Sequence, residues 1–282
     1  MEQRSYTRLT LALDIMGRIS EGPLAGYHEL ATVKHQIDLF DTISIEPAGE
    51  LTVECTHPDV PSDERNICHK AVMLVQREYC VDRQVCVRID KKIPVMGGLA
   101  GGSANAATTL TLLNSLWDLQ LDTGELMRLG KMLGMDVPFY FLGKTAFDTE
   151  AGGVCEAIPT AVQLTFVLAF PDFGVSTAEA YRGIDYSFIG SKYVATEKMR
   201  QFFLANDRSL VVSCIHNDFE QSVFRQYPKC ASIKQELIDA GCETAVLSGS
   251  GSTLFGIARD RDHAAEIGKK LSCRSMVVSS LV

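Results

Sequence analysis

A glycine-rich segment at residues 94–107 constrains the fold more than any other feature. It reads Pro-Val-Met-Gly-Gly-Leu-Ala-Gly-Gly-Ser-Ala-Asn-Ala-Ala. Alternating apolar residues at 85–89 predict a strand before it, and Ala106, Leu110 and Leu113 follow helical spacing after it. The chain therefore predicts a strand that passes through a glycine turn into the N-terminus of a helix.

Such a turn is suited to binding phosphate. Glycines adopt positive φ and let the backbone approach oxygen atoms closely, while the first turn of a helix offers free N–H groups and the positive end of its dipole. Ser103 adds a hydroxyl for phosphate or for a bound Mg²⁺. A plain connection would need only one glycine. We predict phosphate contacts at Pro94, Val95, Met96, Gly97, Gly98, Leu99, Ala100, Gly101, Gly102, Ser103 and Ala104.

Better-known motifs do not match. A Walker loop needs a lysine where Ser103 stands, the Rossmann spacing G-x-G-x-x-G does not occur, and the His28-Glu29 pair lacks the second histidine of a zinc-protease helix.

Composition excludes other classes of protein. A formal net charge of −8 argues against non-specific nucleic-acid binding, and no apolar stretch is long enough to span a membrane. The nine cysteines lack C-x-x-C spacing and predict reduced thiols in a cytoplasmic protein.

Periodicity predicts the remaining elements of the first half. Leu9 to Ile15 alternates as a strand, with Arg8 and Thr10 about 6.6 Å apart on its polar face. Residues 41–55 resemble a hairpin, and a helix is expected to begin near Ser62 as its cap.

The second half predicts an α+β domain. After the apolar run 166–170 the order is helix 229–240, strand 243–248, strand 254–258, helix 262–271 and strand 275–280. This order differs from a regular βαβ alternation. We place the domain boundary near residue 158, with domains at 1–158 and 159–282.

The glycine segment also resembles the second motif of the GHMP kinases, P-x-x-x-G-L-[AG]-G-S-[SA]. Further segments fit, in the same order, the branch of that family that phosphorylates a cytidine diphosphate-linked methylerythritol. They are residues 26–30 (Gly-Tyr-His-Glu-Leu), 134–139 (Gly-Met-Asp-Val-Pro-Phe), 175–181, 217–220 (Asn-Asp-Phe-Glu) and 247–252.

The resemblance implies a two-domain α+β fold. Its N-terminal domain is like domain 2 of ribosomal protein S5 and its C-terminal domain is ferredoxin-like. It also implies ATP in the glycine turn, Mg²⁺ between the phosphates and a small-molecule substrate. We expect a monomer or homodimer.

Asp136 is the expected catalytic base. A carboxylate among apolar neighbours can accept the proton of an attacking hydroxyl, although an aspartate before proline can also be a simple turn residue. By the resemblance, Arg8 is the second catalytic residue and Thr10 contacts substrate, where the family normally has lysine and asparagine. Arginine keeps the charge but not the geometry of an ammonium, and a solvated strand arginine is the alternative.

The same resemblance assigns Tyr27 and His28 to cytidine recognition and Tyr181 to stacking on the cytosine. It assigns Asn66 to adenine and the turn at Ser248 to Ser252 to closing over the phosphates. Tyr27, His28, Tyr181 and the turn at 248–252 also suit purely structural roles. The replacements at positions 8 and 10 leave two alternatives open: a GHMP kinase for another small molecule, or a nucleotide-binding homologue without catalysis.

Overall fold

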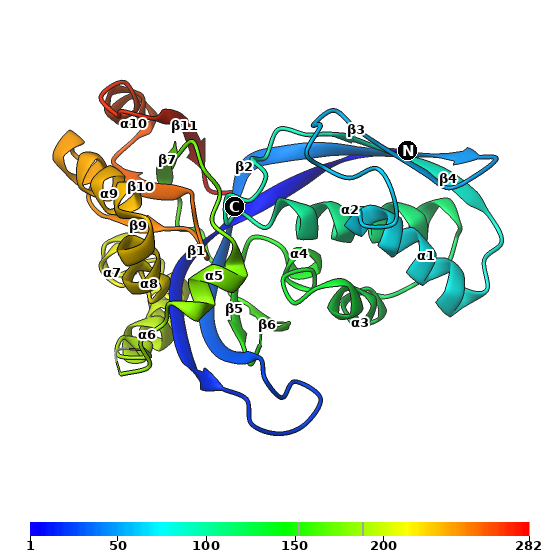
Figure 1. Ribbon diagram of the computed structural model, residues 1–282, viewed down its shortest axis with the longest axis horizontal. Helices are drawn as coiled ribbons and strands as arrows, with labels where there is room; N and C mark the ends of the chain where they lie inside the picture. Colours follow the sequence, from blue (N-terminus) through cyan, green and yellow to red (C-terminus); the bar gives the residue numbers. More distant parts are fainter. Residues whose placement is uncertain (152, 188, 282) are drawn as a thin grey trace. The chain divides into compact units, whose positions relative to one another are not determined.

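The computed structural model describes residues 1–151, 153–187 and 189–281 (Figure 1). Its contacts divide the chain into two compact units. Unit 1 comprises residues 1–7, 39–95 and 100–143, and unit 2 comprises 8–38, 96–99 and 144–282. The long strands β1 (Glu2–Arg18) and β2 (His28–Ala48) each contribute to both units. The units are thus discontinuous in sequence, and the domain boundary near residue 158 stays a prediction.

Unit 1 packs helices on one face of a sheet (Figure 1). The end of β2 pairs antiparallel with β4 (Gln84–Asp90), which pairs parallel with β3 (Thr52–Cys55). The helices are α1 (Ile67–Tyr79), α2 (Gly101–Leu116), α3 (Thr123–Leu133) and the short α4 (Phe139–Leu142). Val85, Val87 and Ile89 of β4 point into the apolar core that these helices cover, as their alternation predicted.

The predicted hairpin at 41–55 is wrong. Strands β2 and β3 are not paired with each other, because β4 lies between them. Both Ile45 and Val53 are register partners of Val87. Two strands that flank a third show the same alternation as a hairpin, so periodicity alone could not distinguish the arrangements.

The predicted cap at Ser62 is also wrong, although the helix itself is confirmed. The N-cap of α1 is Asn66, whose side-chain oxygen accepts a hydrogen bond from the N–H of Cys68 at 2.8 Å. Asparagine and serine are comparably good caps, so propensity did not decide between them.

Unit 2 contains a four-stranded antiparallel sheet in the order β11-β7-β10-β9. Its strands are β7 (Thr165–Phe170), β9 (Ala245–Leu247), β10 (Leu254–Ala258) and β11 (Arg274–Ser279). Helices α9 (Pro228–Ala240) and α10 (Arg261–Gly268) pack on one face of it (Figure 1). This β-α-β-β-α-β order confirms the predicted ferredoxin-like arrangement.

Unit 2 contains further short strands and helices. They are β5 (Thr145–Thr149), β6 (Val154–Ala157), α5 (Thr177–Arg182), α6 (Tyr193–Leu204), α7 (Arg208–Ser213), β8 (His216–Asn217) and α8 (Phe219–Gln226). In unit 2, β5 pairs with β2 and β8 pairs parallel with β1.

No helix among the described residues is long and apolar enough to cross a membrane. All nine cysteines are free thiols.

A fully buried histidine in unit 2 predicts a pH-dependent stability. His35 lies between the hydroxyls of Thr145 (2.8 Å) and Ser280 (2.7 Å), and burial lowers its pKa to about 4. In the unfolded chain the pKa is about 6.5, so below that pH the unfolded state binds a proton that the folded state excludes. The free energy of unfolding should therefore fall as pH drops from 6.5 to 4, by roughly 3 kcal/mol from this residue.

Denaturant unfolding at several pH values checks this prediction. Carboxylates also titrate in this range, so the informative quantity is the difference between wild type and His35→Gln, which has no ionisable group. That difference should shrink as the pH is lowered. A difference that stays constant between pH 7 and 4 would show that His35 is not held neutral by the fold.

Candidate active site

The glycine turn enters α2 without a capping side chain. The N-cap residue is Ala100, in the left-handed region at φ 53°, and the first turn carries no acidic residue. The hydroxyl of Tyr140 donates to the carbonyl oxygen of Ala100 at 3.1 Å and so fixes the start of the helix. A Cβ on Gly101 would lie 2.8 Å from Ile93 Cγ2, so packing excludes a side chain there. The turn is thus rigidly placed, with no side chain capping its helical N–H groups.

A buried ion pair between Lys91 and Asp41 supports the segment that leads into this turn. The ammonium of Lys91 donates to Asp41 Oδ2 at 2.8 Å and to the carbonyl oxygen of Ile93 at 2.5 Å. The other carboxylate oxygen of Asp41 accepts the backbone N–H groups of Lys92 and Ile93. Because its charge is matched by a buried aspartate, Lys91 serves to shape the strand that leads into the turn.

Asp136 lies half-buried in the turn between α3 and α4. Gly134 ends α3, as predicted, and its carbonyl accepts the N–H of Val137 at 3.0 Å. Val137 and Phe139, which follow Asp136, are fully buried and anchor the turn on its C-terminal side. Asp136 therefore belongs to the same unit as α2 and has the apolar neighbours that the sequence predicted.

Asn66 has a structural role that the sequence did not predict. Beside its cap bond to Cys68, its side-chain nitrogen donates to the carbonyl oxygen of Pro61 at 2.6 Å, and the residue is 3% exposed. Both ends of the amide are thus engaged in the fold. Contact between Asn66 and adenine stays a prediction.

In unit 2, residues 97 and 98 of the glycine segment pack against a second glycine-serine turn at residues 248–252. The carbonyl oxygen of Gly98 accepts the hydroxyl of Ser248 at 3.2 Å, and the N–H of Thr253 donates to the carbonyl oxygen of Gly97 at 3.3 Å. As predicted, residues 248–252 connect two paired strands, β9 and β10. Their interlocking with residues 97 and 98 was not evident from the sequence.

Gly98 allows this close approach. Its φ is +72°, and a Cβ there would lie 2.1 Å from the carbonyl oxygen of Ser248. We expect Gly98→Ala to displace the two turns from each other and to weaken ATP binding at least about tenfold. Gly49→Ala is the matched control, because nothing lies within 4 Å of a Cβ on Gly49. Isothermal titration with ATP checks the comparison; equal affinities for the two variants would contradict it.

Arg8 is buried and fixed. It is 5% exposed, which excludes the solvated alternative. Its Nη1 donates to Thr10 Oγ1 at 2.9 Å and to the carbonyl oxygen of Gly98 at 3.0 Å. The two residues that depart from the family pattern therefore interact directly, and the guanidinium is attached to the glycine turn itself.

The predicted cytidine-recognition residues are partly brought together. The rings of His28 and Tyr181 stack with centroids 4.1 Å apart and 16° between their planes, while Tyr27 is 51% exposed. The ring of Phe219 meets that of Tyr181 edge-on at 4.8 Å. A base could stack on the Tyr181 face covered by His28 only if the His28 ring moved aside.

Comparison with known proteins decides the family. The model for the N-terminal domain of GHMP kinases matches residues 66–144, and that for the C-terminal domain matches residues 199–277. A 4-diphosphocytidyl-2-C-methyl-D-erythritol kinase from Gloeobacter violaceus is 35% identical over 94% of this chain and 87% of its own length. The enzyme of that name from Moorella thermoacetica is 36% identical over 95% and 93%.

The chain belongs to the GHMP kinase family.

Solved structures agree on the two-domain GHMP kinase fold. A crystal structure of 4-(cytidine 5'-diphospho)-2C-methyl-D-erythritol kinase superimposes with a TM-score of 0.80 and 25% identity, covering 99% of both chains. A homoserine kinase from Cytophaga hutchinsonii superimposes with a TM-score of 0.74 at 17% identity, over 98% and 94%, and shows the fold alone. The predicted fold and kinase activity are thereby confirmed.

Two residues that contact or surround His28 in this GHMP kinase, Tyr186 and Arg18, were not predicted from the sequence. The hydroxyl of Tyr186 lies 2.8 Å from His28 Nε2 and accepts the Nε–H of Arg18 at 2.9 Å. Because the guanidinium can only donate, the hydroxyl hydrogen of Tyr186 is left to donate to His28. Burial and then the charge of Arg18 lower the pKa of His28, which favours the neutral ring. Neither Tyr186 nor Arg18 lies in a recognisable motif.

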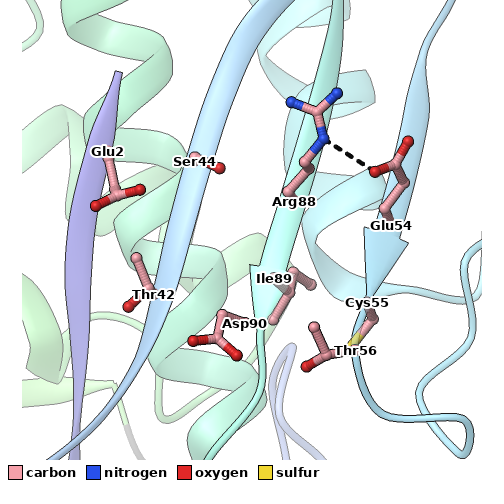
Figure 2. A pocket seen from close by; sticks show the side chains of 9 residues that line it. All are labelled: Glu2, Thr42, Ser44, Glu54, Cys55, Thr56, Arg88, Ile89 and Asp90. Atoms are coloured by element: carbon pink, nitrogen blue, oxygen red, sulfur yellow. Dashed lines mark hydrogen bonds and ion pairs between the residues drawn. The ribbon is translucent and has the colours of Figure 1, made fainter.

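A separate hollow of about 400 Å³ lies on the sheet of unit 1 (Figure 2). Its lining comes from β1, β2, β3, β4 and Thr56 just after β3, and includes none of the predicted site residues. Arg88, the one basic residue lining it, pairs with Glu54 and Glu46. Its charge is therefore neutralised within the sheet, and the hollow offers no site comparable to the glycine turns of this GHMP kinase.

Proposed function

We propose that this GHMP kinase transfers the terminal phosphoryl group of ATP to the 2-hydroxyl of 4-diphosphocytidyl-2-C-methyl-D-erythritol, a step of non-mevalonate isoprenoid biosynthesis. The observation that carries the proposal is the similarity to kinases of that name over nearly the whole chain. The interlocked glycine turns and the placement of Asp136 support it.

The chemistry follows from these residues. The N–H groups at the start of α2 are suited to the phosphates, and Asp136 accepts or orients the proton of the attacking hydroxyl. Arg8 places a fixed positive charge at Gly98, where it can stabilise charge on the transferred group. Tyr27, His28 and Tyr181 are proposed to recognise the cytidine, with His28 moving off the face of Tyr181.

We propose that Mg²⁺ would be held mainly by the phosphates of ATP. Among the described residues, no group of three or more His, Cys, Asp or Glu side chains could hold a metal. Mg²⁺ commonly keeps several waters and binds through one or two protein ligands plus substrate phosphates. We propose Ser103, in the first turn of α2, as a protein ligand to an ion that neutralises phosphate charge.

A phosphate-transfer assay tests the function. The purified protein is incubated with ATP, Mg²⁺ and, separately, the cytidine substrate, mevalonate, galactose or homoserine, and each product is weighed by mass spectrometry. Gain of one phosphate on the cytidine substrate alone is the expected result. Gain on another alcohol would establish a different GHMP kinase, and ATP binding without transfer would establish a non-catalytic homologue.

A kinase acting on a different substrate is the second candidate, because Arg8 and Thr10, which bond each other directly, depart from the family pattern. Together they replace the lysine and asparagine typical of the family. A cytoplasmic location and a monomeric or homodimeric state remain part of the proposal.

A further inference from the structure

The motif Asn217-Asp218-Phe219-Glu220 has no part in the chemistry proposed above, yet it is bonded to the site. Asn217 is 5% exposed at the end of β8. Its side-chain nitrogen donates to the carbonyl oxygens of Leu247 and Gly249, both at 2.8 Å, and its oxygen accepts the N–H of Phe219 at 2.9 Å. Every hydrogen-bonding group of the amide is thus engaged. One N–H group binds Gly249 in the turn at residues 248–252, and the other binds Leu247, just before that turn.

Gly249, like Ser248, packs against the site residues. A Cβ on Gly249 would lie 3.0 Å from the carbonyl oxygen of Gly98 and 3.7 Å from Nη1 of Arg8. The same Gly98 oxygen accepts the Arg8 guanidinium. Asn217 therefore holds the residue against which Gly98 and Arg8 pack.

Two other side chains of the motif reinforce this hold. Glu220 accepts the N–H of Leu247 at 3.0 Å, so both backbone polar groups of Leu247 are bound by the motif. Asp218 Oδ2 accepts the N–H of Ile15 at 2.9 Å, which attaches the motif to β1, the strand that carries Arg8. The motif thus joins the strand of the cation to the second glycine turn.

We propose that Asn217 is a positioning residue for phosphoryl transfer, fixing the turn at residues 248–252 and through it the Gly98 carbonyl that holds Arg8. The inference rests on the proposed kinase function. Aspartate has nearly the same shape and keeps the acceptor for Phe219, but it cannot donate. Asn217→Asp therefore leaves two buried carbonyl oxygens facing a carboxylate.

The test compares Asn217→Asp with Thr196→Val. Thr196 is fully buried in the same unit and donates to Asp14, with no bond to either glycine turn. Both variants lose buried hydrogen bonds, so both should melt at a lower temperature. Only Asn217→Asp should weaken ATP binding, by roughly tenfold or more, and lower kcat, while the KM of the alcohol substrate stays within about twofold.

A folded Asn217→Asp protein with the ATP affinity and kcat of wild type would overturn the inference. So would a Thr196→Val protein with the same loss of ATP affinity, since that would show a general effect of destabilisation. If wild type binds ATP but phosphorylates no alcohol, the proposed function fails and the transfer role of Asn217 fails with it; the ATP affinities then decide separately whether Asn217 positions the nucleotide site. Should Asn217→Asp not fold, Asn217→Ser keeps one donor and is expected to show the same selective effect on ATP, more weakly.

Discussion

Replacement of Asp136 by asparagine is expected to remove nearly all turnover and to leave the fold intact. Asparagine has the same shape but cannot accept the proton of the attacking hydroxyl, and loss of a positioned base typically lowers a rate about 10² to 10⁴-fold. The side chain is half-buried in a turn anchored by Val137 and Phe139, so the substitution should not disturb that anchor. Single-turnover kinetics with saturating ATP and the cytidine substrate measure the effect.

Asp122→Asn is the matched control for this variant. Asp122 caps the other end of the same helix, α3, by accepting the N–H of Glu125 at 2.8 Å. Asparagine is an equally good cap, so this variant should keep both stability and activity. Near-normal turnover in a folded Asp136→Asn protein would retire Asp136 as the base.

Replacement of Arg8 by methionine is expected to lower kcat by at least about 10²-fold, the usual effect of removing one positioned donor from developing charge. Methionine fills much of the same volume but leaves Thr10 and the Gly98 carbonyl without the Arg8 donor. Steady-state kinetics combined with thermal melting separate a loss of charge from a loss of folding. Arg4→Met is the control, because Arg4 is exposed on the same strand.

Arg8→Lys distinguishes charge from geometry. A lysine keeps the charge but has a compact ammonium in place of the planar fork, so it should not reproduce both bonds of Arg8. We expect a partial loss of activity that is recovered when Thr10→Asn is added, since the pair then matches the pattern typical of the family. If the double variant is no better than Arg8→Lys, the residues at positions 8 and 10 do not act as a unit.

Individual strands and helices were predictable where the apolar spacing agreed with the glycines that end an element. The strand before the glycine turn, the helix after it and the end of α3 at Gly134 follow from apolar spacing and glycine position. The arrangement of β3 did not follow, because a strand that pairs with β4 and one that pairs with β2 present the same alternation.

The candidate site divides in the same way. Asp136, Ser103 and the glycine turn could be predicted as site residues because each lies in a contiguous motif. Tyr186 and Arg18 act on His28 from separate segments and carry no local signature. Asn217 was visible as part of a motif, but its bonds run to residues 30 and 32 positions away.

The sequence by itself determined the glycine turn, the strand and helix that flank it, and the family, because these depend on motifs whose residues are neighbours along the chain. Only the tertiary structure decided that Arg8 is buried and bonded to Gly98, and that residues 248–252 pack against that glycine. Such contacts depend on which strands become neighbours in space, and apolar alternation constrains the face of a strand but not its partner.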